Sequence, residues 1–478
     1  MAKNQPLYRP LTDEDVRRID RAGRQVLERV GVRIIGDSYL NTLKKAGAAV
    51  DFEEQRVRFP GSWLDAMVRC APSRFTLHSR DGKNDLRLGD GYVYFANGGR
   101  VFRILDMGTG GYRLTVLRDV AHTAMLVDKL EHINFYIVAC QAHDVGPESY
   151  HYNDFYHALN HTTKHVMGGC DDLKGAEQMW RLASFIAGGE EELRDQPFVS
   201  VITNPISPLT LDANTLDIVQ FCARKGVPLT CAPAPISGAT APATLAGTLV
   251  QMHAEALAGI AICQALAPGA KVLYGSVPTT MDLRNMEITM GSVEMGMMNS
   301  SAVQLAKLYR LPCYASGGVT EAKRPDIQAG FEKHFSNLTV ALTGADCIHL
   351  TAGMIDSGNS ISYEQFVIDD EIIGMIQHIC AGITVDEDTL GLDVIERVGP
   401  GGHYITEEHT IAHMVDEFFY PTLSVRCNFD IWEEGGRPDM LSRAHERVRE
   451  ILEHGQEGLL DLDLIYELKK SFPGIQNT

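Results

Sequence analysis

Eight short apolar runs, rich in β-branched and aromatic residues, constrain the fold of this chain more than any other feature. Each run has the length of one strand, and consecutive runs begin 30 to 43 residues apart, which leaves room for a helix in every interval. Strands that are apolar throughout and alternate with helices are typical of a parallel sheet buried on both faces. The runs begin at Tyr92, Ile133, His165, Phe198, Pro228, Lys271, Leu311 and Asp346.

The intervals between these runs carry amphipathic patterns that predict helices over 175–187, 214–225, 245–266 and 327–342. Eight strand–helix units predict an α/β fold, a closed (β/α)8 TIM-type barrel that spans residues 91–384. An open doubly wound sheet is the structural alternative. Because no GxGxxG follows the first strand, the dinucleotide-binding form of that alternative is disfavoured.

Both flanks of the barrel are expected to be additions to it. Residues 1–90 are predicted to form a helical and β-rich extension packed on the barrel, with a first helix over 12–31 capped by a threonine. Residues 385–478 are predicted to form a helical extension. Its amphipathic helices, over 404–418 and 437–453, are expected to pack on the outside of the barrel.

Composition limits the partners and the compartment. The formal net charge is −19, and an acidic surface of this kind repels phosphate backbones, so no nucleic acid is expected as a partner. The N-terminus lacks the apolar core of a signal peptide, and no uncharged apolar run of about 18 residues predicts a membrane span. The ten cysteines form no CxxC pair and are expected to be reduced. We therefore expect a cytoplasmic protein without a membrane partner.

In a barrel of this type the chemistry lies at the carboxyl ends of the strands. These ends carry glycine pairs, amides and one imidazole, which indicates a mouth kept open for a large reactant. Asn97 and His349 are the predicted catalytic residues, because each is a polar side chain in an apolar strand near the mouth. A buried histidine bonded to a backbone carbonyl is the alternative for His349. The predicted substrate-binding residues are Tyr94, Phe95, Gln141, Asn204, Gly275, Gly317, Gly318, Lys323 and Phe366.

The strand ends lack the acids and bases that hydrolysis or proton transfer requires. Asp144, Asp171 and Asp172 lie near them but form no recognisable catalytic pair, and there is no nucleophile elbow or phosphate-binding loop. No metal site is predicted. The nearest candidates have neither cysteines nor a familiar spacing, and we interpret them as a helix surface: His151, Asp154, His157 and His161.

Several segments resemble the trimethylamine methyltransferase family. The most specific are ASGGVTEAKRPDIQAGFEKHFSNLTVALTGAD and CIHLTAGMIDSGNSISYEQFVIDDEIIGMI, in the last two barrel units. YFANGG near the first strand, SPLTLD after the fourth and GPGGHYITEEHT near the C-terminus are also similar to the family. The resemblance implies a barrel that donates methyl groups to a cognate corrinoid protein. Founding members carry pyrrolysine, which this chain lacks, so it resembles the branch related to glycine betaine:corrinoid methyltransferases.

The resemblance implies transfer of a methyl group from a quaternary amine to the Co(I) of a corrinoid on a partner protein, releasing a tertiary amine. Such a reaction needs no acid, because the amine departs neutral. Glycine betaine is the favoured substrate, because backbone N–H groups of the glycine-rich ends, or Lys323, would bind its carboxylate. Tyr94, Phe95, Tyr136, Tyr314 and Phe366 are candidate walls for the trimethylammonium group, although core packing also explains each one.

The remaining expectations concern cofactors, partners and alternatives. We expect no tightly bound cofactor, and we expect a homo-oligomer. The position that pyrrolysine occupies in founding members is expected in the loop after the seventh strand. A non-catalytic betaine-binding barrel and another barrel enzyme, such as a zinc-dependent methyltransferase or a lyase, are the alternatives to the corrinoid-dependent enzyme.

Overall fold

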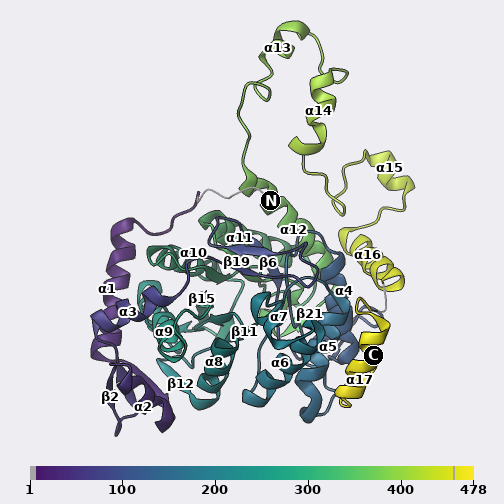
Figure 1. The fold of residues 1–478 in the computed structure, drawn as a ribbon. Coiled ribbons are helices and arrows are strands. Elements are labelled where there is room, and N and C mark those ends of the chain that lie inside the picture. Colours follow the sequence, from purple (N-terminus) through teal and green to yellow (C-terminus); the bar gives the residue numbers. More distant parts are fainter. Residues whose placement is uncertain (1–6, 456–457) are drawn as a thin grey trace.

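A computed structural model describes residues 7–455 and 458–478. The eight predicted runs form one parallel sheet of eight strands, in the order β6-β19-β18-β15-β13-β11-β10-β9 (Figure 1). A parallel bridge between Ala96 and Phe135 joins its two end strands, so the sheet closes and the predicted (β/α)8 barrel is confirmed. The strands are β6 (Tyr94–Asn97), β9 (Tyr136–Ile137), β10 (Val166–Gly168), β11 (Val199–Thr203), β13 (Leu229–Cys231), β15 (Val272–Ser276), β18 (Cys313–Ser316) and β19 (Cys347–Ala352).

Helices cover the outside of the barrel, and their apolar faces bury the strands as the sequence pattern predicts. The longest, α9 (Leu245–Leu266), is long and apolar enough to cross a membrane, but 83% of its most apolar window is buried within the protein. All ten cysteines are free. The other covering helices are α4 (Leu117–Lys129), α5 (Tyr150–His161), α6 (Leu173–Ala187), α7 (Glu190–Asp195), α8 (Ala213–Lys225), α10 (Val293–Leu308), α11 (Ile327–Thr343) and α12 (Tyr363–Ala381).

The N-terminal segment covers one side of the barrel and closes the end at which the strands begin, opposite the mouth. Helix α1 (Asp13–Arg29) begins at Thr12, whose hydroxyl accepts a hydrogen bond from the Asp15 N–H, and it packs on α9. The hairpin of β4 (Phe75–Leu77) and β5 (Leu86–Leu88) buries its leucines against residues from the amino ends of the barrel strands. The remaining elements of this segment are β1 (Val32–Ile35), α2 (Asp37–Lys45), β2 (Ala49–Asp51), β3 (Arg56–Arg58) and α3 (Gly61–Cys70). Strand β1 pairs with β12 (Thr210–Asp212), which belongs to the loop between β11 and α8.

Two small sheets, which the sequence pattern did not predict, arise from the loops that follow the barrel strands. Because these loops leave the carboxyl ends of the strands, the sheets build walls around the mouth of the barrel. One sheet contains β7 (Arg103–Leu105), β8 (Tyr112–Leu114), β20 (Met354–Ile355) and β21 (Ser360–Ile361), and the other contains β14 (Ile236–Ser237), β16 (Thr279–Asp282) and β17 (Glu287–Thr289).

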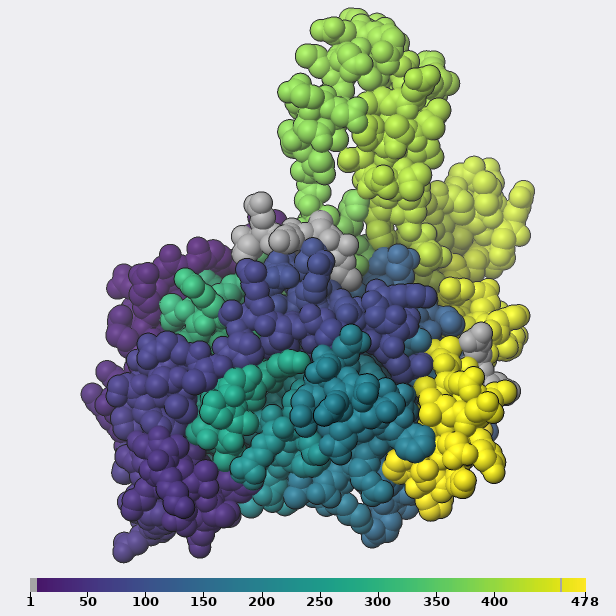
Figure 2. Space-filling model, viewed as in Figure 1, coloured from purple at the N-terminus to yellow at the C-terminus, as the bar shows by residue number. Residues whose placement is uncertain are grey.

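The C-terminal extension divides into a part that packs on the barrel and a part that does not. Helix α16 (Met440–His454) packs on α4 and α12, and α17 (Leu462–Ser471) contacts α6. Residues 382–438 are called the arm below. Most of the arm stands away from the barrel (Figures 1 and 2), whereas Leu423 and Ser424 attach it to α12 by donating hydrogen bonds to Glu371. The expectation that the helix near 404–418 packs on the outside was wrong, because its apolar residues are exposed on the arm. The arm contains α13 (Leu392–Val398), α14 (Glu408–Glu417) and α15 (Phe429–Glu434).

Candidate active site at the mouth of the barrel

A cavity of about 500 Å³ lies at the carboxyl ends of the barrel strands. Residues from seven of the eight strands, or from the loops that follow them, line it. This is the end at which barrel enzymes place their active sites. The lining includes Arg100, Val138, Asp171, Asn204, Val277, Met290, Tyr314, His349 and Met354.

Tyr314 and His349, from neighbouring strands, form one side of this cavity. Their rings are stacked, with centroids 4.1 Å apart and an angle of 24° between the planes. His349 Nε2 lies 2.6 Å from Ser316 Oγ, and that hydroxyl donates to the Ser276 carbonyl at 2.9 Å. Since the single hydroxyl proton of Ser316 is engaged, His349 must donate from Nε2, which assigns the imidazole tautomer and leaves Nδ1 as an acceptor.

The electrostatic state of this pair follows from its burial. Burial lowers the pKa of His349 to about 3, so the imidazole is neutral near neutral pH and is a poor general acid. The Tyr314 hydroxyl is buried and has no hydrogen-bond partner in the described part of the chain. A neutral imidazole stacked on a phenol ring provides an aromatic surface without a competing positive charge.

A local irregularity of β19 accompanies His349. The pairing of β19 with β6 shifts register between Ile348 and Ala352, and Leu350 has φ of 65°. A register shift of this kind bends a strand and redirects its side chains, and such features are concentrated beside active sites. Leu350 lines the cavity together with His349.

Arg100 lies on another part of the cavity wall, just after β6. Its Nε donates to the Tyr150 hydroxyl at 2.7 Å, and its guanidinium carbon lies 4.3 Å from the centroid of the same ring. Its two terminal nitrogens bond to the carboxylate of Asp171 at 2.8 and 3.3 Å. Tyr150, which holds the guanidinium, is buried, whereas the side chain of Asp171 is 65% exposed to solvent.

Helix α5 carries buried ionisable groups that do not line the cavity but interact with Arg100. Burial raises the pKa of Asp154 to about 7, although the charge of Arg100 opposes this shift. The interpretation of His151, Asp154, His157 and His161 as a helix surface was wrong, because all four side chains are buried. The C-terminal tail covers part of this helix, where His157 Nε2 lies 3.0 Å from the Gln476 carbonyl oxygen.

Asn97 does not line the cavity. Its side-chain nitrogen donates to the carbonyls of Gly98 and Ile137 at 2.8 and 2.7 Å, and its oxygen accepts from the Ile137 N–H at 2.9 Å. These bonds join the end of β6 to β9. They use much of the hydrogen-bonding capacity of the amide, so in this structure Asn97 holds two barrel strands together.

The predicted aromatic residues are dispersed. Tyr94 lies in the lower core of the barrel, where its hydroxyl accepts from the Arg87 N–H at 3.0 Å. Phe95 belongs to the main apolar core, and Phe366 lies on α12 against Gly353. The Tyr136 hydroxyl shares a hydrogen bond of 2.9 Å with the hydroxyl of Thr123 on α4. Of the five aromatic candidates, only Tyr314 is part of the cavity lining described above.

The glycine-rich strand ends serve packing more than anion binding. A Cβ on Gly275 would lie 2.5 Å from the Cys231 carbonyl oxygen, and one on Gly318 would lie 2.6 Å from Asn337. The N–H of Gly317 donates to the His349 carbonyl, and that of Gly318 donates to the Ser336 hydroxyl. These N–H groups are therefore occupied, and a carboxylate would not find them free.

The remaining predicted polar residues separate into two groups. Asn204 lines the cavity, and its side chain donates to the Ala232 carbonyl at 2.7 Å. Gln141 lies outside the lining, and its backbone pairs with Val101. Lys323 lies in a different hollow beside α16, where its side chain is 65% exposed and forms an ion pair with Asp356.

Sequence reasoning missed Arg100 and the buried pair of Lys333 and Asp369. Lys333 Nζ lies 3.1 Å from Asp369 Oδ2, and both side chains are fully buried. Lys333 also donates to the carbonyls of Gly318 and Met354, at the ends of the last two strands. Arg100 directly follows the YFANGG segment, and this position after a strand end was the available indication of its place at the mouth.

Comparison with known proteins agrees with the fold and with the resemblance of the sequence. The chain matches the model of the trimethylamine methyltransferase family (MTTB) over residues 1–472. The trimethylamine methyltransferase MttB of Desulfitobacterium hafniense (strain DSM 10664 / DCB-2) is 35% identical over 443 residues, which are 93% of this chain and 89% of that protein. A glycine betaine methyltransferase of Desulfitobacterium hafniense (strain Y51) is 32% identical over 466 residues, covering 97% of this chain and 96% of that protein.

A solved structure supports the architecture. The hydroxylamine complex of MtmB aligns with a TM-score of 0.51 at 12% identity and covers 92% of this chain and 93% of that chain. At this identity the likeness concerns the fold alone, whereas the sequence matches span nearly the whole protein at more than 30% identity. The chain therefore belongs to the trimethylamine methyltransferase family.

Proposed function

We propose that this protein transfers a methyl group from a carboxylated quaternary amine, with glycine betaine favoured, to the Co(I) of a corrinoid carried by a partner protein. The carbon–nitrogen bond breaks with its electron pair remaining on nitrogen, and a carbon–cobalt bond forms with the electron pair of Co(I). The product is a neutral tertiary amine group. The observation that carries the proposal is one cavity lined by the stacked Tyr314–His349 pair and by Arg100.

The aromatic part of the cavity suits the trimethylammonium group. Cations are attracted to the faces of aromatic rings by about 0.5–2 kcal/mol per contact. His349 does not oppose the cation with a charge, because burial lowers its pKa to about 3. Its role is to position the substrate, since the departing amine needs no proton.

The carboxylate of the substrate is assigned to Arg100. Asp171 already occupies the guanidinium, but its side chain is 65% exposed, so water can solvate its carboxylate once it is displaced. A substrate carboxylate would therefore exchange one ion pair with Arg100 for an equivalent one while Tyr150 keeps the guanidinium in place. Arg100 takes the role that we expected from the sequence for the backbone N–H groups of the glycine-rich strand ends or for Lys323. The relative named glycine betaine methyltransferase supports this choice of substrate.

Demethylation of a substrate panel by the purified protein with chemically reduced free cobalamin tests this function. Glycine betaine is expected to convert the Co(I) spectrum to that of methyl-Co(III), and faster than proline betaine, carnitine, choline, trimethylamine or tetramethylammonium. Equally fast demethylation with a thiol or tetrahydrofolate and without corrinoid would refute the proposal. Binding of betaine without any methyl transfer would instead support a binding protein.

We also propose that the arm packs on a second copy of this chain. Its exposed apolar side chains present on the order of 1,000 Å², comparable with the ~800 Å² per partner of a standard interface. Such a surface needs permanent cover, because it would otherwise promote aggregation. The corrinoid protein must leave after each methyl transfer, so a second copy is the better occupant. The side chains are those of Ile383, Val385, Leu390, Leu392, Ile395, Tyr404, Ile405, Ile411, Met414, Val415, Phe418, Tyr420, Val425, Phe429 and Ile431.

A further inference from the structure

The arm has almost no hydrophobic core of its own. Within residues 382–438, all of which the structure describes, Val394 and Leu423 are the buried large apolar side chains. Short helices are marginal in water unless tertiary contacts hold them. Segments too small to build a core use disulfides, metals or association with another chain. The two cysteine-free helices α13 and α14 therefore need a link that apolar packing within the arm does not supply.

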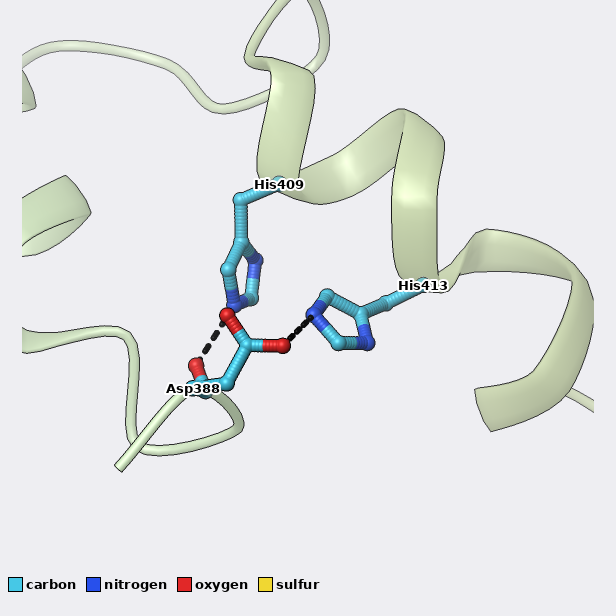
Figure 3. A group of neighbouring side chains, drawn as sticks. All are labelled: Asp388, His409 and His413. Carbon is cyan, nitrogen blue, oxygen red and sulfur yellow. Dashed lines mark hydrogen bonds and ion pairs between the residues drawn. The ribbon is translucent and has the colours of Figure 1, made fainter. Parts of the chain in front are cut away.

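A cluster of three potential metal ligands lies between α14 and the loop that precedes α13 (Figure 3). His409 and His413 are one turn apart on α14, and their ring centroids are 4.3 Å apart. Asp388 lies on the loop before α13, and its Oδ2 is 3.2 Å from His413 Nε2. His409 Nε2 points to the same loop, 3.0 Å from the Asp388 carbonyl oxygen. One potential ligand atom from each residue lies within 4.8 Å of the others.

We propose that Asp388, His409 and His413 bind a divalent transition-metal ion of the Zn²⁺ class, which links α14 to the loop before α13. Two imidazole nitrogens and one carboxylate oxygen form a common zinc ligand set, with a fourth position open to water. In a tetrahedral site, ligands about 2.0–2.1 Å from the metal are separated by about 3.3 Å. The 3.2 Å between His413 Nε2 and Asp388 Oδ2 already matches that separation.

The sequence of the loop also favours a cation. Asp386 and Glu387 precede Asp388 directly, so three consecutive carboxylates belong to this loop. The Asp386 carboxylate accepts a hydrogen bond from the Thr389 N–H at 2.8 Å, which orders the loop on both sides of Asp388. Ligation requires His409 to exchange its hydrogen bond with the Asp388 carbonyl for the metal.

The competing explanation is a simple ion pair between His413 and Asp388. The Asp388 side chain is 79% exposed, and exposed ion pairs contribute about 0–1 kcal/mol, so an ion pair alone would hold the arm weakly. A metal would fix three groups together and add its binding free energy to the stability of the arm. The two explanations differ in a measurable way, because only a metal site takes up one ion per chain.

Metal uptake by the tag-free, full-length protein after treatment with a chelator tests the proposal. Titration with Co²⁺ should produce visible absorption bands typical of tetrahedral coordination. Calorimetry with Zn²⁺ should give one site per chain with a dissociation constant below about 10 µM. Zn²⁺ should also slow limited proteolysis within residues 382–438. Mg²⁺ should have no effect, because it disfavours imidazole ligands.

Variants distinguish this site from adventitious binding. His413→Ala and Asp388→Asn should each weaken Zn²⁺ binding at least about 100-fold, as expected when one of three ligands is lost. The matched control is His403→Ala, which removes an exposed histidine of the same arm and should bind Zn²⁺ as the wild type does. Absence of stoichiometric uptake by the wild type would overturn the proposal, and so would uptake that persists in the Asp388→Asn/His413→Ala double variant.

Discussion

The imidazole of His349 stacks on the phenol ring of Tyr314, 4.1 Å away, while its Nε2 is held by Ser316 at 2.6 Å. Two residues of β18 therefore fix the orientation of the His349 ring: Tyr314 by stacking and Ser316 by a hydrogen bond. This arrangement is suited to holding a substrate in a single pose, which is the main contribution that a methyl transfer without acid–base catalysis requires.

Replacement of His349 tests this role. His349→Ala should lower turnover by about 10- to 1000-fold, the scale of lost positioning, and leave the circular dichroism spectrum unchanged. Tyr314→Phe keeps the ring and should retain most activity, whereas Tyr314→Ala should raise KM for the amine. The measurements are steady-state rates with Co(I) cobalamin. Full activity of His349→Ala would contradict a positioning role.

The pH dependence separates His349 from Asp154. Burial lowers the pKa of His349 to about 3, so this residue stays neutral from roughly pH 5 to 9 and contributes no inflection there. Burial raises the pKa of Asp154 to about 7, so this carboxyl loses its proton as the pH rises through neutrality. An inflection of kcat/KM near pH 7 should therefore disappear in Asp154→Asn and persist in His349→Gln. The opposite result would make His349 the ionising group.

The barrel could be predicted from the sequence because its determinants are local. Each strand is an apolar run, each helix has an amphipathic face, and the spacing of the two requires parallel pairing. The arm could not be predicted in the same way. The amphipathic pattern of α14 shows that one face needs cover but does not show which chain provides it, and Ile411 and Val415 remain exposed here.

The site was predicted in part, and the two catalytic candidates show why. Side chains of a strand alternate between its two faces, so a polar residue in an apolar run can point either way. His349 has the same parity as Cys347, which lies in the inner core of the barrel, and it reaches the cavity. Asn97 has the parity of Phe95, which is absent from that inner cluster and belongs to the main core. The sequence alone does not show whether a given strand residue points into the barrel or towards the helices around it.

Arg100 provides a test of the carboxylate subsite. Arg100→Gln should raise KM for glycine betaine by about 10- to 100-fold, because a charged hydrogen-bonded contact contributes about 1.5–3 kcal/mol. Demethylation of tetramethylammonium, which has no carboxylate, should change little. Lys323→Ala is the matched control and should leave both substrates unaffected, because Lys323 lies in another hollow. An equal loss for both substrates would show that Arg100 acts on the structure and not on the carboxylate.

The buried pair of Lys333 and Asp369 should matter for stability. Lys333→Met leaves the fully buried carboxylate of Asp369 without its partner and should reduce the free energy of unfolding by about 3–5 kcal/mol. In Lys333→Met/Asp369→Asn both charges are absent, and the new side-chain oxygen can still accept the Gly353 N–H. Urea unfolding should therefore show a smaller loss for the double variant than for Lys333→Met. A larger loss would mean that the hydrogen bonds of this pair outweigh its charge balance.

The arm allows a test of self-association that leaves the barrel untouched. Ile411 and Val415 are exposed on α14 at 62% and 68%, one turn apart, so Ile411→Asp/Val415→Asp places two charges on a face that we expect to be covered by a second copy. Charges buried at an interface without partners oppose association strongly. Light scattering coupled to size-exclusion chromatography should show an oligomer for the wild type and a smaller species for the variant. Glu408→Gln, at the start of the same helix, is the control and should keep the wild-type mass. A monomeric wild type would exclude a second copy as the partner of the arm, and an unchanged mass of the double variant would place the contact elsewhere.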